Sequence, residues 1–429
     1  MLSLIGLLTI VVIVALLLSG RITPIAGLAL VPVFAALLAG FNLEQIGGFF
    51  NDGVIKVLPV VIMFIFAILY FGLMNDVGLF APLISGMTRL SRGSIIGVSV
   101  ATVIIAAIAH LDGSGASTFL ITIPALLPLY RRLRMNPYLL LLLVGTSASI
   151  MNMVPWGGPI GRAGAVLKVD PTALWRPLIP LQGIALLLLI GLAVFLGLRE
   201  KRRIASSGPS EVAPAEAVVV ESRVSAGRFW FNAALTAGVI TLLVWGVIPA
   251  GLTFMLGASV ALIVNFPQLD DQLKRLKAHA PNALLMAAII LAAGSFLGIL
   301  NGTGMLKALA TDFVAYMPTG LSRHLHLVIG FFGVPLELVL DTNATYFALL
   351  PVMLEIVTGY GVEAVPAAYA LIIGNIIGTF VSPFSPALWL ALGLANLDMG
   401  KHIRYSLPWV WGFSLALLAV AIGLGIVGL

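Results

Sequence analysis

The stretch "IAHLDGSGASTF" at residues 108–119 places polar side chains and two glycines between two strongly apolar segments. A second stretch of the same character, "LDTNAT", occupies residues 340–345 in the C-terminal half of the chain. Such stretches are ordinary turns outside a membrane, but polar non-helical backbone at bilayer depth needs protein or a water-filled cavity around it. Their surroundings therefore decide whether they are plain turns or binding sites.

The composition of the chain is that of a membrane protein. Of its 429 residues, 60% are hydrophobic and 9% are charged, whereas soluble domains have about 25% charged residues. Several apolar runs approach the ~20 residues that a helix needs to cross a bilayer. The first, "LSLIGLLTIVVIVALLLSG" at residues 2–20, lacks the basic start and the cleavage site of a signal peptide, so it is predicted to be a helix.

The cysteine count and the net charge exclude several classes of function. The sequence contains no cysteine, which excludes disulfides and thiolate metal sites. The formal net charge is +6. In a membrane protein this charge reflects basic loops on the cytoplasmic side, so the expected partner is the lipid bilayer and no nucleic acid is expected.

The two halves of the chain resemble each other. Residues of the first half recur about 228 positions later: Gly72 as Gly298 (298 − 72 = 226), Asp112 as Asp341 (341 − 112 = 229), Pro155 as Pro383 (383 − 155 = 228) and Arg176 as Arg404 (404 − 176 = 228). A nearly constant offset over so long a stretch predicts a duplication. We expect one repeat at residues 1–198 and a second at residues 229–429, joined by a flexible polar linker at residues 199–228.

Each repeat is predicted to contain five membrane crossings, one re-entrant helical hairpin and one broken helix. The hairpins are expected at residues 94–130 and 322–357, and the broken helices at residues 138–176 and 364–395. Because five is an odd number, the second repeat must enter the membrane upside down. The predicted fold class is therefore an all-α polytopic membrane protein built from two inverted-topology repeats.

The distribution of basic residues predicts the orientation in the membrane. With the linker in the cytoplasm, most of the 23 lysine and arginine residues fall in cytoplasmic loops, among them Arg131, Lys274 and Lys401. Both termini then lie outside a cytoplasmic (inner) membrane that the chain crosses many times. If each hairpin were a full crossing instead, most of the early basic loops would lie on the wrong side.

Four polar stretches interrupt the apolar segments in repeat register, at residues 110–118, 149–162, 340–345 and 378–387. Glycine permits tight reversals of the chain, and proline frees a carbonyl group. Half-helix N-termini offer N–H groups to an anion, while unwound carbonyls and hydroxyls suit a cation. Four breaks in register favour a binding site over four unrelated turns.

Five ionisable residues in or near these breaks are candidates for function. Asp112 and Asp341 are candidate cation ligands or proton carriers, because acids are rare and costly within a membrane span; alternatively they only cap half-helices. His110 is either a proton relay or a packed histidine. Glu337, four residues before Asp341, is a second protonatable site or a rim residue. Arg162 either pairs with a substrate carboxylate or anchors a helix end at the interface.

At these positions the sequence resembles the citrate–divalent-metal:proton symporter family of the ion transporter superfamily. The segments that carry the resemblance are "IFAILYFGLMNDVGLF" (65–80), "LDGSGASTFLITIPALLPLYRRL" (111–133), "SIMNMVPWGGPIGRAGAVLKVDP" (149–171) and "VSPFSPALWLALGLANLDMGKHIRYSLPW" (381–409). The resemblance implies a secondary transporter, not an enzyme, that carries citrate or a related small carboxylate with H⁺ or Na⁺ and needs no cofactor. It also implies a homodimer and an elevator-type movement.

The resemblance also implies which residues bind the substrate. The first tip contributes Gly113, Ser114, Ser117 and Thr118, and the first break contributes Asn152, Pro155, Gly157 and Gly158. The second tip contributes Thr342, Asn343 and Thr345, and the second break contributes Ser382, Pro383 and Ser385. Arg162 completes this candidate set.

The first tip departs from the family pattern in a way that affects the predicted cargo. Ser114 stands where the family commonly has a second acid, and Ala116 and Ser117 stand where it has threonines. Mg²⁺ and Ca²⁺ prefer charged oxygen ligands, so the loss of a carboxylate weakens a site for a substrate-borne metal. A free dicarboxylate or another small organic anion fits as well as a metal–citrate complex.

Two other functions compete with carboxylate transport. A cation:proton antiporter or an anion exporter of the same superfamily would share the fold. An intramembrane hydrolase could use Asp112 and Asp341 as an acid dyad, or His110, Asp112 and Ser117 as a triad. Duplication alone explains why the two aspartates match, which argues against the hydrolase. The sequence has no P-loop motif, so no nucleotide-driven motor is expected.

Overall fold

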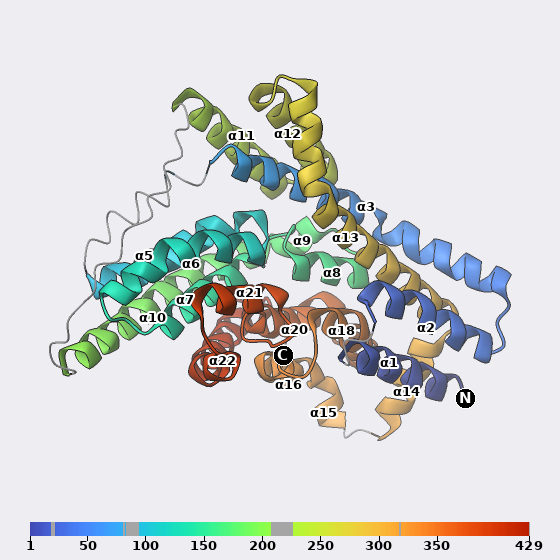
Figure 1. Cartoon of the computed structure of the whole chain (residues 1–429). Helices are drawn as coiled ribbons and strands as arrows, with labels where there is room; N and C mark the ends of the chain where they lie inside the picture. Colours follow the sequence, from blue (N-terminus) through green and yellow to red (C-terminus); the bar gives the residue numbers. More distant parts are fainter. Residues whose placement is uncertain (19–21, 80–81, 83–93, 207–225, 317–318, 429) are drawn as a thin grey trace.

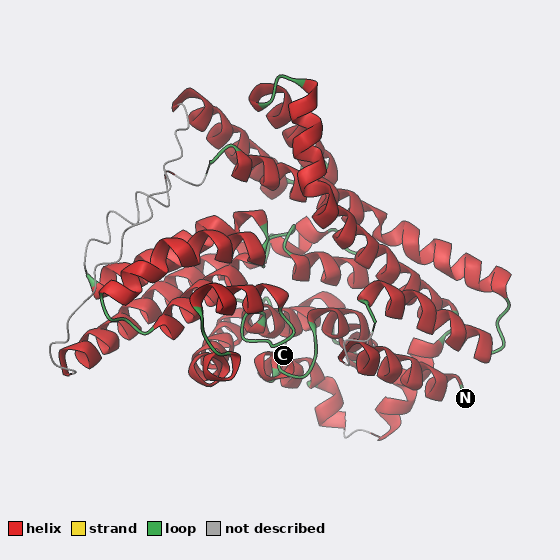
Figure 2. Cartoon of the chain, in the orientation of Figure 1, coloured by secondary structure: helices red, strands yellow, loops and turns green. Residues whose placement is uncertain are grey.

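The computed structural model describes residues 1–18, 22–79, 82, 94–206, 226–316 and 319–428. Within these ranges every regular element is a helix and none is a strand, as Figure 2 shows. Six of the described helices are long and apolar enough to cross a membrane. These features confirm the predicted all-α, multi-pass fold class.

The helices of the first half follow one another from the N-terminus to the predicted linker (Figure 1). They are α1 (Leu2–Leu18), α2 (Pro24–Leu38), α3 (Leu43–Asp76), α5 (Ile95–Ala109), the 3₁₀ turn η1 (His110–Asp112), α6 (Gly115–Arg132), α7 (Pro137–Met151), α8 (Gly158–Leu167), α9 (Pro171–Trp175) and α10 (Leu178–Ser206).

The helices of the second half begin after the predicted linker. They are α11 (Ala226–Trp245), α12 (Ala250–Asn265), α13 (Leu269–Gly302), α14 (Met305–Tyr316), α15 (Thr319–Arg323), α16 (Leu325–Phe331), α17 (Gly333–Leu336), α18 (Thr342–Ala344), the π-helical turn η2 (Thr345–Leu349), α19 (Leu350–Thr358), α20 (Ala364–Gly378), α21 (Pro386–Ala395) and α22 (Met399–Gly423).

Local sequence signals explain where several helices begin. Asn42 and Gln45 form a capping box at the start of α3, with reciprocal hydrogen bonds of 2.9 and 3.0 Å. Asn136 caps α7 and is followed by Pro137 at the first helical position, where the missing N–H group costs nothing. Helices α8 and α21 likewise have a proline in their first two positions. Each of them begins near the end of a predicted break.

Helices α3 and α13 form the longest helix pair of the molecule (Figure 1). A Cβ atom at Gly298 would lie 2.8 Å from Cα of Gly53, and a Cβ atom at Gly72 would lie 2.6 Å from the ring of His279. The two helices therefore run antiparallel with their backbones in close contact. Each is 34 residues long and their starts are 226 positions apart (269 − 43 = 226), so the two helices that carry the predicted repeat-mates Gly72 and Gly298 pack against each other in opposite directions.

The predicted boundaries need two comments. Helix α10 extends to Ser206 and α11 begins at Ala226, so both ends of the predicted linker are helical, and residues 207–225 lie outside the described part. Within the first predicted hairpin, residues 95–112 form a segment long enough by itself to cross a membrane. The choice between a hairpin and a full crossing therefore stays a prediction.

Candidate substrate and coupling-ion site

The first tip is a turn organised around Asp112. Its Oδ1 accepts a hydrogen bond of 2.8 Å from the backbone N–H of Ser114, and its Oδ2 accepts one from the hydroxyl of Ser117. Gly113 adopts φ +71°, in the left-handed region that glycine favours. Ser114 is the N-cap of α6. The aspartate thus holds the reversal between η1 and α6, which agrees with the capping alternative and leaves the cation role a proposal.

His110 joins the first tip to the first break. It is fully buried, and its Nδ1 and Nε2 atoms lie 2.7 Å from Oγ1 of Thr118 and 3.0 Å from Oδ1 of Asn152. Trp156 adds a second link, because its indole N–H donates a 2.8 Å hydrogen bond to the carbonyl of Leu111. Both ring nitrogens of His110 are therefore occupied, as expected for a packed histidine.

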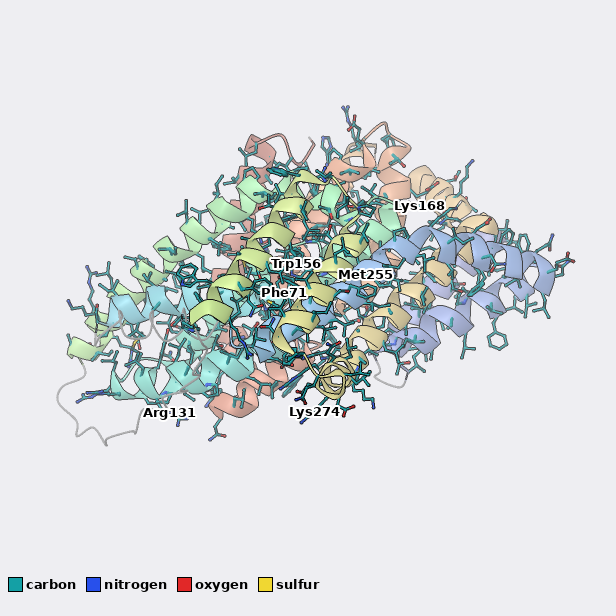
Figure 3. The ribbon with its side chains drawn as sticks, turned by 90° about the horizontal axis from the view of Figure 1, so that it is seen from above. Phe71, Arg131, Trp156, Lys168, Met255 and Lys274 are labelled. Carbon is teal, nitrogen blue, oxygen red and sulfur yellow. The ribbon has the colours of Figure 1, made fainter. Side chains whose placement is uncertain are left out.

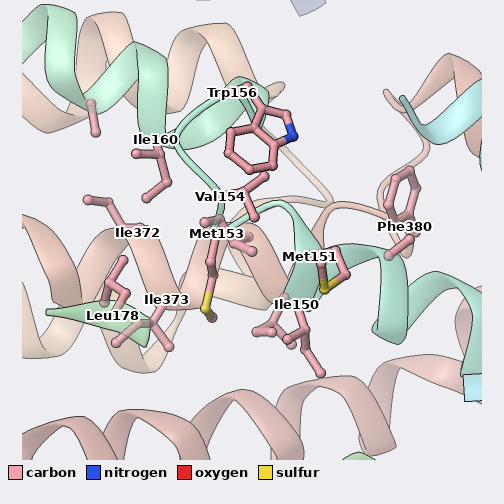
Figure 4. Close-up of a cluster of buried hydrophobic side chains, with 14 of the residues drawn as sticks. Ile150, Met151, Met153, Val154, Trp156, Ile160, Leu178, Ile372, Ile373 and Phe380 are labelled. Atoms are coloured by element: carbon pink, nitrogen blue, oxygen red, sulfur yellow. The ribbon is translucent and has the colours of Figure 1, made fainter. Parts of the chain in front are cut away.

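The first break is an apolar loop between α7 and α8. Pro155 is buried within it, and Gly157 is the N-cap of α8. Gly157 packs directly on the backbone of Asn152, where a Cβ atom would collide with the carbonyl group. Figure 4 shows the apolar side chains of this loop and, from α20, Ile372 and Ile373 within the same buried cluster. Close packing therefore holds the start of α8 in place.

The second tip is capped in the same manner as the first. The carboxylate of Asp341 accepts hydrogen bonds from the backbone N–H groups of Asn343 (3.2 Å) and Ala344 (3.0 Å), and from the side-chain amide of Asn343 (2.9 Å). The hydroxyl of Thr345 donates to the carbonyl of Asp341, and Thr342 is the first residue of α18. Both tips are thus small turns closed by an aspartate.

Arg162 connects the two halves. It lies on α8 in the first half, and its Nε donates a 3.0 Å hydrogen bond to Oδ1 of Asn343 in the second tip. Its side chain also lies over the start of α8, because a Cβ atom at Gly158 would be 2.5 Å from Nη1. Arg162 is only 8% exposed. It is therefore an interior residue, and the alternative that it anchors a helix end at the interface is wrong.

Glu337 lies in a buried polar cluster beside the second tip. Its carboxylate contacts the side-chain amide of Asn375, and its backbone carbonyl accepts a 2.6 Å hydrogen bond from the hydroxyl of Ser382. Glu337 is 1% exposed, so the alternative of a rim residue is wrong. Among the described residues, Oδ1 of Asn375 and the hydroxyl of Tyr346 are buried without a hydrogen-bond partner. This cluster therefore has spare oxygen atoms beside a buried carboxylate.

The second break approaches the first tip. A Cβ atom at Gly115 would lie 2.9 Å from both the ring of Phe380 and the side chain of Ala387. The Phe380 ring also packs edge-on against Phe119 at 5.1 Å. Of the predicted residues in this break, Ser382 donates a hydrogen bond to the carbonyl of Glu337, beside the second tip; the Pro383 carbonyl accepts from the indole N–H of Trp389, and Ser385 is the N-cap of α21.

The four breaks are therefore connected across the two halves. The first tip is hydrogen-bonded to the first break, the second break is hydrogen-bonded to Glu337 beside the second tip, and each tip touches the helix that follows the break of the other half. In Figure 3, Trp156 lies near the middle of the molecule, Arg131 and Lys274 lie along the lower edge, and Lys168 lies higher. Among the described residues, no three His, Asp or Glu side chains gather into a metal site.

Sequence reasoning missed two side chains of this arrangement. Asn375 could have been found, because it is a lone amide in the apolar run "ALIIGNIIG" at residues 370–378. Phe380 carries no comparable signal, because aromatic residues in an apolar segment usually only fill the core. Its position follows from the packing of distant helices.

Comparison with known proteins identifies the family. A family model described as "Citrate transporter" matches residues 2–374. The citrate transporter of Bacillus subtilis (strain 168) is 35% identical over 434 residues, which cover 100% of both chains. The Mg(2+)/citrate complex secondary transporter of the same organism is 33% identical over 432 residues, again covering 100% of both.

This chain belongs to the citrate transporter family. The predicted resemblance is thereby confirmed, as is the prediction of a multi-pass membrane transporter rather than an enzyme. A solved structure, that of the YdaH transporter of Alcanivorax borkumensis, has a TM-score of 0.63 at 18% identity and covers 89% of this chain and 88% of its own. That likeness concerns the fold alone.

Proposed function

We propose that this member of the citrate transporter family is a secondary active carrier of citrate or a related small carboxylate, driven by a gradient of H⁺ or Na⁺. Two relatives that match the whole chain are named for citrate and for a Mg²⁺/citrate complex. The observation that carries the proposal is the position of Arg162, which lies over the start of α8 and bonds Asn343 of the opposite half.

The substrate carboxylate binds where Arg162 meets the start of α8. A guanidinium group binds carboxylates through two parallel hydrogen bonds, and the free N–H groups of a helix N-terminus add a partial positive charge. The remaining candidate ligands of this proposal are Gly113, Ser114, Ser117 and Thr118 of the first tip, Asn152, Pro155, Gly157 and Gly158 of the first break, and Thr342, Asn343, Thr345, Ser382, Pro383 and Ser385 of the second half.

The coupling ion binds beside the second tip. Glu337 supplies a buried carboxylate, and the unpaired oxygens of Asn375 and Tyr346 supply neutral ligands or an acceptor for a proton. Asp112 and Asp341 add charge at the two tips but already accept several hydrogen bonds. His110 keeps the first tip attached to α7. Among the four predicted coupling residues, Glu337 is therefore the strongest candidate.

Several finer features belong to the same proposal. The cargo travels either as a free anion or with Mg²⁺ or Ca²⁺; Ser114 in place of an acid favours the free anion. Two inverted repeats, with the linker in the cytoplasm, meet at the four breaks and move as an elevator in a homodimer. The antiparallel contact between α3 and α13 supports the inverted repeats, and the separation of Arg131 and Lys274 from Lys168 in Figure 3 supports the orientation.

Uptake by reconstituted protein tests the function. Proteoliposomes are loaded with buffer so that a pH gradient or a Na⁺ gradient can be imposed separately, and entry of radiolabelled citrate is measured with and without Mg²⁺ or Ca²⁺. We expect uptake above the equilibrium level with one of the two gradients, and competition by other small carboxylates. Transport that carboxylates do not affect but that the gradient of another ion drives would establish the antiporter or exporter instead.

The same assay tests the coupling residue. The Glu337→Gln variant preserves the hydrogen bond to Asn375 and removes the charge. We expect this variant to exchange external for internal citrate but to lose accumulation, because exchange needs substrate binding without a net movement of the coupling ion. Gradient-driven accumulation at the wild-type rate would remove Glu337 from the mechanism.

A further inference from the structure

A cavity with several polar lining residues lies apart from the tips and breaks. It has a volume of about 220 Å³ and lies between α3, the end of α8 and α13. Its polar lining residues are Asp52, Lys56, Lys168 and Asn301. None of them belongs to the candidate substrate and coupling-ion site.

The end of α8 borders this cavity, beside the close contact of α3 and α13. Gly53, Gly294, Gly298 and Gly302 lie on its walls, and the Cβ positions of the first three point at the facing helix. Lys168 is the C-cap of α8 and adopts the left-handed conformation, with φ +58° and ψ +37°. The chain turns away at this residue and leaves the lysine side chain exposed at the cavity wall. Both lysines are thus accessible from solvent.

The charges of the cavity favour an anion. Within the described part of the chain, neither Lys56 nor Lys168 lies within 4.0 Å of a carboxylate oxygen. Asp52 is one helical turn before Lys56 on α3, where it offsets part of the positive charge. Two lysines against one aspartate leave a net charge of +1 on the lining.

The cavity also lies at the end of the helix that carries Arg162. Helix α8 ends at Leu167, and its C-cap Lys168 follows Arg162 by six residues, which is about 9 Å of rise in a helix. Gly161 packs against the ring of Phe64 on α3, while Ala165 shares the cavity wall with Val57, two turns earlier on α3. The side of α8 that meets α3 therefore lines the cavity at Ala165 and is covered by Phe64 at Gly161, next to Arg162.

We propose that this cavity is an approach site for the anionic cargo, a di- or tricarboxylate, which Lys56 and Lys168 hold before it reaches Arg162. This inference rests on the proposed carboxylate transport. In the predicted orientation the cavity opens toward the outer face, so it serves substrate that enters the cell. Because the site acts through charge, a tricarboxylate gains more from it than a monocarboxylate.

Charge-removing variants test the site. Lys56→Gln keeps a good helix former, and Lys168→Asn suits the left-handed conformation at that position. We expect the KM for external citrate at low salt to rise about threefold in each single variant and about tenfold in the double variant, with little change in maximal rate. Salt should remove most of the difference, because it screens exposed charges. Asp52→Asn should lower the KM.

Lys307→Gln is the matched control, because Lys307 is an exposed lysine shortly after α13 that does not line the cavity. We expect its KM to equal that of the wild type. In addition, the natively cysteine-free chain allows charge restoration in a Lys56→Cys variant. An aminoethyl thiosulfonate should restore the low KM by returning a cation, whereas a sulfonatoethyl reagent should raise the KM further.

The outcomes separate this inference from the proposed function. Wild-type uptake by itself decides whether the protein carries carboxylates. If the wild type carries citrate but the double variant has an unchanged KM at low salt, the approach site is overturned and the carrier function stands. Equal effects of both thiosulfonate reagents on the Lys56→Cys variant would also overturn the approach site.

Discussion

At the scale of single residues, Arg162 is the centre of the proposed substrate site. A buried arginine without a partner is costly, and here one hydrogen bond goes to Asn343 while the rest of the guanidinium lies over the start of α8. The carboxylates of Asp341 and Glu337 act on its charge electrostatically. In the proposed function a substrate carboxylate adds direct hydrogen bonds to the guanidinium.

Replacing Arg162 tests this argument. Arg162→Gln should raise the KM for citrate about 10-fold or more, because hydrogen bonds to a charged group contribute about 1.5–3 kcal/mol. The KM of Arg162→Lys should lie between those of the wild type and Arg162→Gln, since lysine retains the charge but lacks the planar fork of the guanidinium. Arg404→Gln, at an exposed arginine, is the control and should leave the KM unchanged. Wild-type kinetics in Arg162→Gln would exclude this residue from the binding site.

At the scale of elements, the contact between α3 and α13 determines how the two halves meet. Small residues allow membrane helices to approach closely, where van der Waals contact replaces the hydrophobic effect as the source of stability. Gly53 faces Gly294 and Gly298 at one end of the pair, and Gly72 faces His279 at the other. Near that second end Asp76 forms a 3.4 Å ion pair with Arg275 and a 3.0 Å hydrogen bond with His279, so polar contacts also join the two helices.

Alanine substitutions on α3 test the importance of this contact. In Gly53→Ala the new methyl group would collide with the carbonyl of Gly294, and we expect a loss of about 1–3 kcal/mol in stability. Gly48→Ala is the matched control on the same helix, because no atom lies within 4 Å of its Cβ position; it should raise stability slightly. Melting temperatures of the purified protein in detergent measure both effects, and equal values would contradict the close contact.

At the scale of the whole molecule, the orientation in the membrane decides which cavity faces which compartment. The structure places Arg131 and Lys274 along one edge and Lys168 away from it (Figure 3). The positive-inside rule predicts that the first edge faces the cytoplasm. In this predicted orientation the proposed approach site near Lys168 faces outward, and the predicted linker faces inward.

Cysteine labelling measures this orientation directly. In the cysteine-free background, Ser206→Cys and Glu363→Cys introduce single thiols at exposed positions. A membrane-impermeant maleimide added to intact cells should label the second variant and not the first, and permeabilised cells should allow both to react. Labelling of both variants in intact cells would contradict the predicted topology, and with it the outward direction of the approach site.

The sequence by itself determined the class of the protein and the places where its helices break. These features do not depend on how the helices pack: the lengths of the apolar runs, the offset between Asp112 and Asp341, and the glycines and prolines of the breaks. They were sufficient to predict an all-α transporter and to locate the tips. They could not show whether Glu337 is a rim residue or Arg162 an interface anchor, because burial depends on neighbours from other helices.

Only the tertiary structure decided which side chains meet. The pairs Arg162–Asn343 and Glu337–Asn375 join residues 181 and 38 positions apart, and no periodicity in the sequence links them. The cavity between Lys56 and Lys168 lies where the end of α8 meets the glycine-lined contact of α3 and α13. Such contacts follow from the crossing angles and interaxial distances of packed helices, which short-range sequence signals do not specify.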